Sequence, residues 1–179
     1  PLLELFNRYP IAELTIHPRV RRDFYKGRPR MEAFAAAAAA GCRPICYNGD
    51  LTTPESVSAF SSAFPAVEAV MIGRGAVADP AVFRKCAGGA GASAEELRGF
   101  HDELYEGYCR AFDSRRNAML RMKEVWSYLI GLFEDGGRWA KALRKERVPA
   151  QYERLTAELF RSVPLRVRPR EVWRQEGKL

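Results

Sequence analysis

The stretch VMIGRGAVADP, Val70–Pro80, joins an apolar run to a Gly-Arg-Gly turn and then to the start of a helix. The two glycines of such a turn let the backbone approach a ligand closely, with amide groups pointing outward. A following helix directs its positive end to the same place, and Arg74 adds a guanidinium group. The pattern predicts a phosphate-binding turn at Gly73 and Arg74, although a tight turn with a solvated arginine has the same sequence.

Two earlier segments show the same change from an apolar run to a polar turn. The runs Ala12–His17 and Arg43–Asp50 resemble Val67–Gly75, and helix-forming stretches separate the three. This alternation predicts parallel β-α-β units, and runs that are apolar on both faces predict a sheet covered on both sides. Because ligands of parallel α/β folds bind at the carboxyl ends of the strands, the turns IHPR, NGD and GRG predict one shared site.

The helices of this first half carry recognisable start and stop signals. The alanine-rich stretch Met31–Gly41 is a strong helix former that ends at a glycine. Thr53 followed by Pro54 predicts the start of another helix, and Asp79 followed by Pro80 predicts a third.

The second half of the chain reads as helical. A glycine-rich linker, Cys86–Ser93, precedes a helix predicted over Ser93–Asp113 that opens with a capping box. A second helix is predicted over Ser114–Glu134, broken by a Gly-Gly pair, and RWAKALRKER and AQYERLTAELFRSV predict two shorter ones. We therefore expect β/α units over residues 1–88 and a helical bundle over residues 93–179.

Composition excludes several classes of protein. Hydrophobic residues make up 47% of the 179 residues, which argues against wholesale disorder. The sequence contains no apolar run of membrane-spanning length and does not begin with a secretory signal. Four cysteines without a CxxC pair, and only two histidines, argue against a metal site and fit reduced thiols in the cytoplasm.

The net charge of +7 comes mostly from arginine, and part of it is concentrated in one loop. Between residues 19 and 30, six basic residues and two aromatic ones stand against one acid. Basic and aromatic side chains together suit RNA, although a solvated loop or helix face is the alternative. The candidates for RNA contact are Arg19, Arg21, Arg22, Tyr25 and Lys26 in the loop, and Arg116, Arg121 and Lys123 on the second long helix.

The other strand ends offer further ligand-binding groups. His17 could donate to a cofactor carbonyl or phosphate, and Asn48 with the Gly49 amide could hold a phosphate or a polyol. Asp50 could bind a hydroxyl group or orient a partner. Each also has a structural interpretation, because Asn-Gly forms ordinary turns and a lone histidine often satisfies a core contact. His101 is assigned to the surface or to packing.

The segments ELTIHPRVRRDFYKG, YNGD and VMIGRGAVADPAVF, followed by MKEVWSYL, resemble the tRNA-dihydrouridine synthases in order and spacing, roughly over Asn7–Leu132. The resemblance implies a partial TIM barrel, its last three β/α units, followed by a helical tRNA-binding domain. In that family NADPH reduces FMN, hydride passes to C6 of a flipped uracil in tRNA, and a cysteine on an earlier loop protonates C5.

The resemblance also implies an FMN site at the three strand ends. Its members would be His17, Asn48, Gly49, Asp50, Gly73 and Arg74. Arg19 would face the uracil or the flavin. None of the cysteines has the expected Cys-Pro context, so no catalytic residue is assigned, and we expect the carboxyl-terminal portion of the enzyme. Because three strands cannot close a barrel, this portion alone should be inactive and should bind FMN weakly or not at all.

Two other functions are compatible with the sequence. Other FMN-dependent barrel oxidoreductases, of the dihydroorotate or enoate type, also end in glycine-rich phosphate turns, but a basic helical domain is unnecessary for a small substrate. A non-catalytic RNA-binding module is the second alternative. We expect a cytoplasmic enzyme with tRNA as its partner, monomeric at full length.

Overall fold

The computed structural model describes residues 2–23, 27–41 and 44–171. The chain forms two compact units, Pro1–Gly75 and Ala76–Leu179. This division falls ahead of the glycine-rich linker at which we placed the domain boundary, and that boundary stays a prediction. Within the described part of the chain, no helix is long and apolar enough to cross a membrane.

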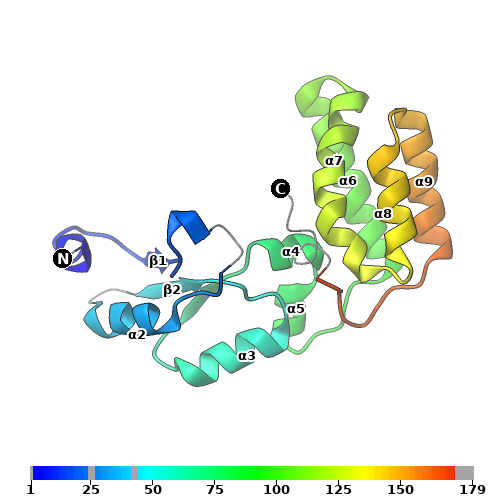
Figure 1. Cartoon of the computed structure of the whole chain (residues 1–179). Coiled ribbons are helices and arrows are strands. Elements are labelled where there is room, and N and C mark those ends of the chain that lie inside the picture. Colours follow the sequence, from blue (N-terminus) through cyan, green and yellow to red (C-terminus); the bar gives the residue numbers. More distant parts are fainter. Residues whose placement is uncertain (1, 24–26, 42–43, 172–179) are drawn as a thin grey trace. The chain divides into compact units, whose positions relative to one another are not determined.

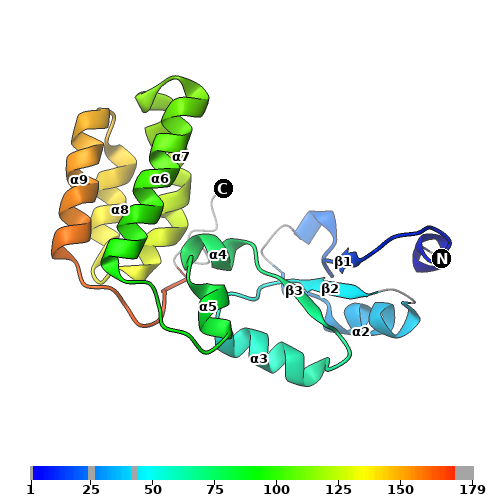
Figure 2. The ribbon, with the colours of Figure 1, turned by 180° about the vertical axis from the view of Figure 1, so that it is seen from behind.

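A parallel three-stranded sheet organises unit 1, as predicted. The strands β1 (Leu14–Ile16), β2 (Ile45–Asn48) and β3 (Ala69–Met71) lie in the order β1-β2-β3. Tyr47 in the central strand pairs with Ile16 on one side and with Val70 on the other. Figure 2 shows β3 beside β2, and the carboxyl ends of all three strands therefore reach the same edge of the sheet.

Burial differs between the strands, which corrects one prediction. Ile45, Cys46 and Tyr47 of β2 are buried, but β1 and β3 are only partly covered, and Met71 is 52% exposed. The apolar runs predicted a sheet covered on both faces along all strands. Only β2 has a neighbouring strand on each side, whereas β1 and β3 are the edges of this sheet.

Helices pack on the central strand through aromatic side chains. Unit 1 contains α1 (Leu2–Phe6), η1 (Arg21–Asp23), α2 (Met31–Ala40) and α3 (Pro54–Ala63). Phe34 of α2 meets the Tyr47 ring edge-on at 4.8 Å, and Phe60 of α3 stacks on the same ring at 4.1 Å. Both helices therefore cover the side of the sheet to which Tyr47 points (Figure 1).

The predicted start of α3 is confirmed in detail. The Thr53 side chain accepts a hydrogen bond from the Ser56 amide, and Ser56 returns one to the Thr53 backbone, with Pro54 as the first helical residue. This reciprocal cap satisfies amide groups that have no partner within the helix.

Unit 2 is helical. It contains most of α4 (Arg74–Ala78), followed by α5 (Val82–Cys86), α6 (Ala94–Phe112), α7 (Arg115–Leu129), η2 (Ile130–Leu132), α8 (Gly136–Lys145) and α9 (Pro149–Ser162). Ser93 and Glu96 form the predicted capping box of α6. Hydrogen bonds from Arg84 and from the Ser93 backbone lower the pKa of Glu96 to about 2.

Two helix boundaries in unit 2 differ from the predictions. The second long helix ends at Leu129 rather than near Glu134, because the chain tightens into η2, and the Gly-Gly pair begins α8. Asp79 does not cap a helix, since α5 starts at Val82. The buried Asp79 carboxylate instead accepts from the Ala81 amide at 3.1 Å and from the Lys85 ammonium at 2.6 Å.

A polar network lies within the core of unit 2. His101, which we assigned to the surface or to packing, is buried, and its Nε2 lies 2.7 Å from the Tyr152 hydroxyl. Trp126 Nε1 donates to the same hydroxyl at 2.9 Å, and His101 Nδ1 lies 2.8 Å from Asp102. Burial lowers the pKa of His101, so the neutral ring accepts from Tyr152 and donates to Asp102 at neutral pH.

Candidate functional site

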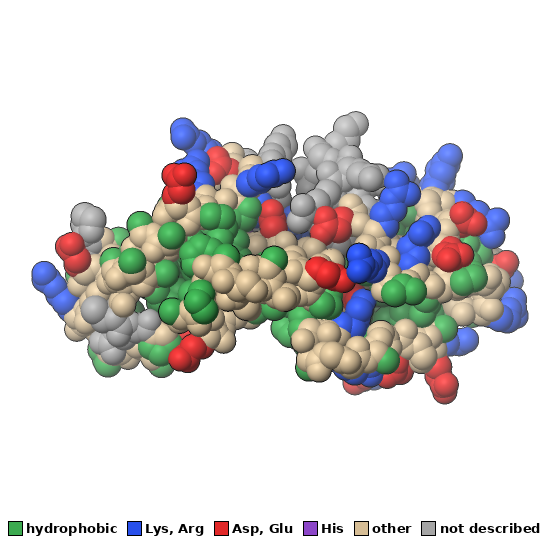
Figure 3. All heavy atoms as spheres, turned by 90° about the horizontal axis from the view of Figure 1, so that it is seen from below, with side chains coloured by type: hydrophobic (Ala, Val, Ile, Leu, Met, Phe, Trp, Pro, Cys, Tyr) green, Lys and Arg blue, Asp and Glu red, His purple; other side chains and the backbone are tan. Residues whose placement is uncertain are grey.

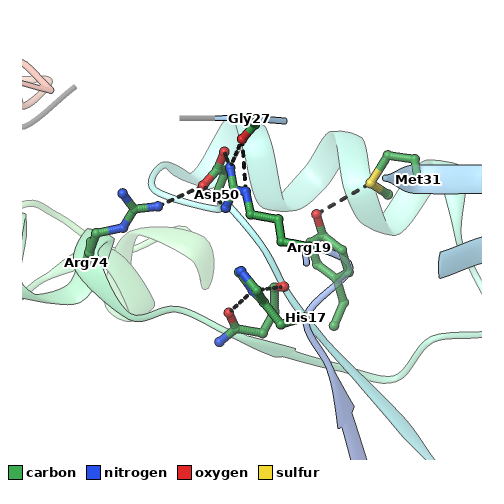
Figure 4. A network of polar contacts seen from close by, with 8 residues as sticks. His17, Arg19, Gly27, Met31, Asp50 and Arg74 are labelled. Carbon is green, nitrogen blue, oxygen red and sulfur yellow. Dashed lines mark hydrogen bonds and ion pairs between the residues drawn. The ribbon is translucent and has the colours of Figure 1, made fainter. Parts of the chain in front are cut away.

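Asp50 joins the three strand ends. It follows β2 with a backbone φ of 50°, a left-handed conformation that aspartate tolerates better than most residues. Its carboxylate accepts from Arg19 Nη1 at 2.9 Å and Nη2 at 2.5 Å, and from Arg74 Nη2 at 2.8 Å (Figure 4). Arg19 follows β1 and Arg74 follows β3, so the polar turns meet as the sequence predicted.

Arg19 is a structural part of this cluster. Its side chain is 2% exposed, and besides Asp50 it donates through Nε at 2.9 Å and Nη2 at 2.5 Å to the carbonyl oxygen of Gly27. The guanidinium group therefore ties the basic loop to the end of β2. Its burial lends no support to direct RNA contact at Arg19, which remains a prediction.

His17 and Asn48 form a second contact at the same edge. His17 Nδ1 lies 2.7 Å from the Asn48 carbonyl oxygen and 2.8 Å from its side-chain Oδ1 (Figure 4). Both oxygens are acceptors, so Nδ1 carries the proton and Nε2 of a neutral ring is an acceptor. Donation from Nε2 to a phosphate, as we predicted, would require the doubly protonated ring.

The three glycines of the site have different roles. A Cβ at Gly49 would lie 2.5 Å from the Tyr47 hydroxyl, and one at Gly75 would lie 2.8 Å from the Thr52 Cα. A Cβ at Gly73 would meet nothing within 4 Å. Gly49 and Gly75 are therefore needed for packing inside the protein, and only Gly73 faces the open space where the sequence predicted a ligand.

This difference gives a matched pair of substitutions. Gly75→Ala is expected to lower the free energy of unfolding by about 1.5 kcal/mol, because the new methyl group collides with backbone that cannot move aside locally. Gly73→Ala should change it by less than about 0.5 kcal/mol. Urea unfolding of both variants, followed by circular dichroism, measures the two effects. Equal loss of stability in both variants would contradict the assignment of Gly75 to internal packing and of Gly73 to open space.

The basic residues predicted to contact RNA are spread over two elements. Arg21 and Arg22 are exposed in η1, and Arg116 and Arg121 are exposed on α7, where Arg121 pairs with Glu124 at 2.6 Å. Tyr25 and Lys26 lie outside the described residues. Figure 3 shows basic and acidic side chains interspersed on one face, so positive charge alone does not mark an RNA surface there.

Lys123 makes contacts within the helical unit. Its ammonium group donates to the carbonyl oxygen of Arg144 at 3.1 Å and also to that of Glu146, at the end of α8. Burial lowers the pKa of Lys123. This lysine satisfies helix-end carbonyls and so fastens α7 to α8.

Two of the described cysteines, Cys46 and Cys109, do not have the features of activated thiols. Burial raises the pKa of Cys46 and of Cys109, so both stay protonated at neutral pH. Cys86 is exposed, and Cys42 lies outside the described residues. Among the described residues, no three His, Cys, Asp or Glu side chains are grouped closely enough to hold a metal ion.

Sequence reasoning missed that Asp50 is shared between two arginines. The signal was present, because an acid and two bases follow neighbouring parallel strands whose ends must converge. For Asp50 we predicted a bond to a hydroxyl group or a partner that it orients, without identifying Arg19 and Arg74 as its partners.

Taken together, the sheet and its polar edge define a parallel α/β protein with a cationic site at the carboxyl ends of its strands. Residues 5–149 match the family model described as dihydrouridine synthase (Dus), and the chain belongs to that family.

Curated relatives agree with this assignment. The chain is 37% identical over 75 residues to tRNA-dihydrouridine synthase B of Shewanella oneidensis, covering 42% of the chain and 23% of the relative. It is 36% identical over 82 residues to the synthase B of Pseudomonas aeruginosa, covering 46% and 24%. For that of Proteus vulgaris, identity is 33% over 84 residues, covering 47% and 26%. The chain thus spans about a quarter of the length of the curated relatives it matches.

Proposed function

We propose that this chain is part of a tRNA-dihydrouridine synthase, an enzyme that reduces the C5=C6 bond of a uridine in tRNA with FMN and NADPH. The family match supports the reaction class. The observation that carries the site is the convergence of Arg19, Asp50 and Arg74 beside the His17–Asn48 pair.

The residues present fit the phosphate end of FMN. Two guanidinium groups share the Asp50 carboxylate, which leaves an excess of positive charge at the strand ends. Arg74 is 23% exposed, and the space beside Gly73 is open. A guanidinium fork, a nearby Asn48 amide and a glycine without steric obstruction are groups that recognise a phosphate.

Each residue then has a distinct part in binding. Arg74 would contact the phosphate, held in direction by Asp50, while Asn48 and the Gly49 backbone would hold the phosphate and the ribityl hydroxyls. His17, held by Asn48 through Nδ1, would offer Nε2 as a hydrogen-bond acceptor to an N–H or hydroxyl group of the cofactor. When bound, FMN supplies the hydride for uracil reduction. Arg19 positions the basic loop through its bonds to Gly27 and Asp50.

Closure of a TIM barrel needs more strands than the three in this sheet. The edges β1 and β3 each pair with β2. We propose that the remaining strands, and the acid that protonates C5, are supplied from outside these 179 residues. The chain alone should therefore bind FMN weakly and show no reductase activity.

For the substrate, we propose that the loop residues Arg21, Arg22, Tyr25 and Lys26 contact tRNA, together with Arg116 and Arg121 of the helical unit. Their cationic groups would bind backbone phosphates, and the tyrosine would stack on a base. RNA contact by Lys123, whose ammonium group bonds to carbonyls at the end of α8, stays a prediction. Reaction with tRNA would place the protein in the cytoplasm.

The test is deletion of the gene that encodes this chain, followed by mass spectrometry of bulk tRNA. Dihydrouridine should fall at one or more positions while pseudouridine stays constant. The wild-type gene should restore it. The gene with Arg98→Ala should also restore it, because this control removes only an exposed ion pair with Asp102 on α6. The gene with Arg74→Ala should restore at least tenfold less.

Unchanged dihydrouridine after deletion would overturn the proposal. Flavin-dependent reduction of a small enone by the gene product would then favour the dihydroorotate or enoate type. Binding of tRNA without any change in its modification would favour the non-catalytic module.

A further inference from the structure

The glycine-rich segment between α5 and α6, residues 87–92, is bound by one side chain of α5. Its composition is typical of a flexible linker, and residues 87–91 are exposed. Arg84 nevertheless donates through Nε to the carbonyl oxygen of Ala90 at 2.9 Å and through Nη2 to that of Gly91 at 3.1 Å. These bonds fasten the middle of the segment to α5.

The same guanidinium group reaches the start of α6. Its Nη1 and Nη2 donate to the two carboxylate oxygens of Glu96, at 2.8 and 3.1 Å. Glu96 also accepts from the Ser93 amide at 2.8 Å, as part of the helix cap. A planar fork that pairs with a carboxylate in this way fixes direction as well as distance. Arg84 therefore connects α5, the glycine-rich segment and the first turn of α6.

The backbone of the glycine-rich segment turns closely around Arg84. The Gly89 amide donates to the Arg84 carbonyl at 2.9 Å, and Gly88 has a φ of 82°, a conformation that glycine adopts readily. A Cβ at Gly89 would lie 2.7 Å from the Arg84 Cγ, whereas one at Gly91 would meet nothing within 4 Å. The close approach to Arg84 thus requires glycine at position 89 but not at position 91.

A weaker attachment holds α5 from the carboxyl-terminal side. Lys85 donates to the buried Asp79 carboxylate at 2.6 Å and to the Val167 carbonyl at 3.4 Å. The segment that carries Val167 is itself bonded to η2, since the Arg166 amide donates to the Leu132 carbonyl at 2.7 Å. The helix α5 is therefore attached to the helical bundle twice, once through the start of α6 and once through the segment after α9.

The exposure of this cluster decides where its effect should be visible. The side chains of Arg84 and Glu96 are about half exposed, and an exposed ion pair by itself contributes little to global stability. This pair differs because the guanidinium group also binds two backbone carbonyls and the carboxylate also caps a helix. We therefore expect its loss to release the local backbone without unfolding the bundle.

We propose that Arg84 makes the glycine-rich segment a rigid joint, which fixes the direction in which α6 leaves α5, so that α5 and the helical bundle move as one body. The division of the chain at Gly75, ahead of this segment, agrees with such a joint. The joint does not depend on the proposed function. Under that function, it would hold the bundle in one orientation relative to the α5 segment, which follows the phosphate contact Arg74.

Hydrogen exchange of the full 179-residue chain, measured by mass spectrometry, tests the role of Arg84. In Arg84→Ala, amides of residues 88–96 should exchange at least tenfold faster, while those of α7 and α9 stay unchanged. Arg84→Lys should behave like the alanine variant, because an ammonium group lacks the fork that reaches both carbonyls and the carboxylate. The control Arg98→Ala, which removes an exposed pair with Asp102 on α6, should change exchange less than twofold.

Two glycine substitutions distinguish a rigid joint from a flexible linker. Gly89→Ala should speed exchange of residues 88–96 as Arg84→Ala does, because the new methyl group displaces the Arg84 side chain. Gly91→Ala should change exchange less than twofold, since its methyl group enters open space. An equal response to both substitutions, or normal exchange in Arg84→Ala, would overturn the proposal.

Distances between spin labels test whether the joint is rigid. One label is attached to the exposed Cys86 at the end of α5 and the other to a cysteine introduced by Arg154→Cys on α9, with the other cysteines replaced by alanine. Double electron–electron resonance should give a single narrow distance distribution, and Arg84→Ala should broaden it at least twofold. A broad distribution in the chain with Arg84, or the same width in both proteins, would refute a rigid joint held by this arginine.

These outcomes are separable from those that test the proposed function. If gene deletion removes dihydrouridine but Arg84→Ala changes neither exchange nor the distance distribution, only the joint fails. If deletion leaves dihydrouridine unchanged and Arg84→Ala loosens the segment, the synthase proposal fails and the joint stands.

Discussion

Replacement of Asp50 by asparagine is expected to lower the free energy of unfolding of unit 1 by about 3 to 4 kcal/mol, because it leaves a buried guanidinium group without its counter-charge. Arg19 is 2% exposed and directs both terminal nitrogens at the carboxylate. Asparagine tolerates the left-handed backbone at this position, so the substitution tests the charge and not the turn. The carbonyl group of Gly27 compensates for only part of the loss.

Hydrogen exchange measured by mass spectrometry locates the effect. Amides of β2 should exchange at least 100-fold faster in Asp50→Asn, while those of α6 and α9 stay protected, since they belong to unit 2. Asp23→Asn is the control, because its partner Arg30 is 48% exposed and such pairs contribute about 0–1 kcal/mol. Unaltered protection of β2 in Asp50→Asn would refute the role of this cluster as the junction of the strand ends.

Tyr152→Phe should destabilise unit 2 by about 3 kcal/mol, because it removes one oxygen that serves two buried partners. Trp126 Nε1 would keep its proton without an acceptor, and His101 Nε2 would lose its donor. Tyr152 is fully buried, so water cannot replace the hydroxyl without opening the core. Phenylalanine keeps the shape of the ring, so the change in the free energy of unfolding reports the loss of the hydrogen bonds alone.

Urea unfolding followed by tryptophan fluorescence measures this change, since Trp126 and Trp139 lie in the core of the helical unit. Tyr108→Phe is a suitable comparison, because that partly buried ring stacks on Phe112, and it should cost less than about 0.5 kcal/mol. If the two variants unfolded at the same urea concentration, the network would contribute little to stability.

Local structure followed from local sequence. The cap at Ser93 was predictable because Glu96 three residues later completes a capping box, and the cap at Thr53 because a proline follows it in the first helical position. The return bond from Ser56 to Thr53 was not predicted. The parallel order of the strands was equally accessible, since short strands separated by single helices leave few alternatives. Helix ends were predicted less accurately. The helix predicted to reach Glu134 ends at Leu129, because tightening into η2 depends on what the helix end packs against.

The candidate site was predictable in its location but not in its internal pairing. Parallel strands must end at one edge, so His17, Asn48 and Arg74 could be brought together from the sequence. Which of the charged groups would neutralise one another depends on distances of a few ångströms, and those are set by packing. The same limitation applies to Lys123, whose amino group turned out to lie on the end of α8.

By itself, the sequence determined the helices, the parallel sheet and the convergence of polar turns, because periodicity, caps and chain connectivity are local or topological properties. Only the tertiary structure decided that Gly75 is needed for packing while Gly73 faces open space. It alone brought the Arg84 side chain onto the glycine-rich segment and the cap of α6. These outcomes depend on which side chains meet across the fold, and electrostatic and steric interactions vary too steeply with distance for residue order to specify them.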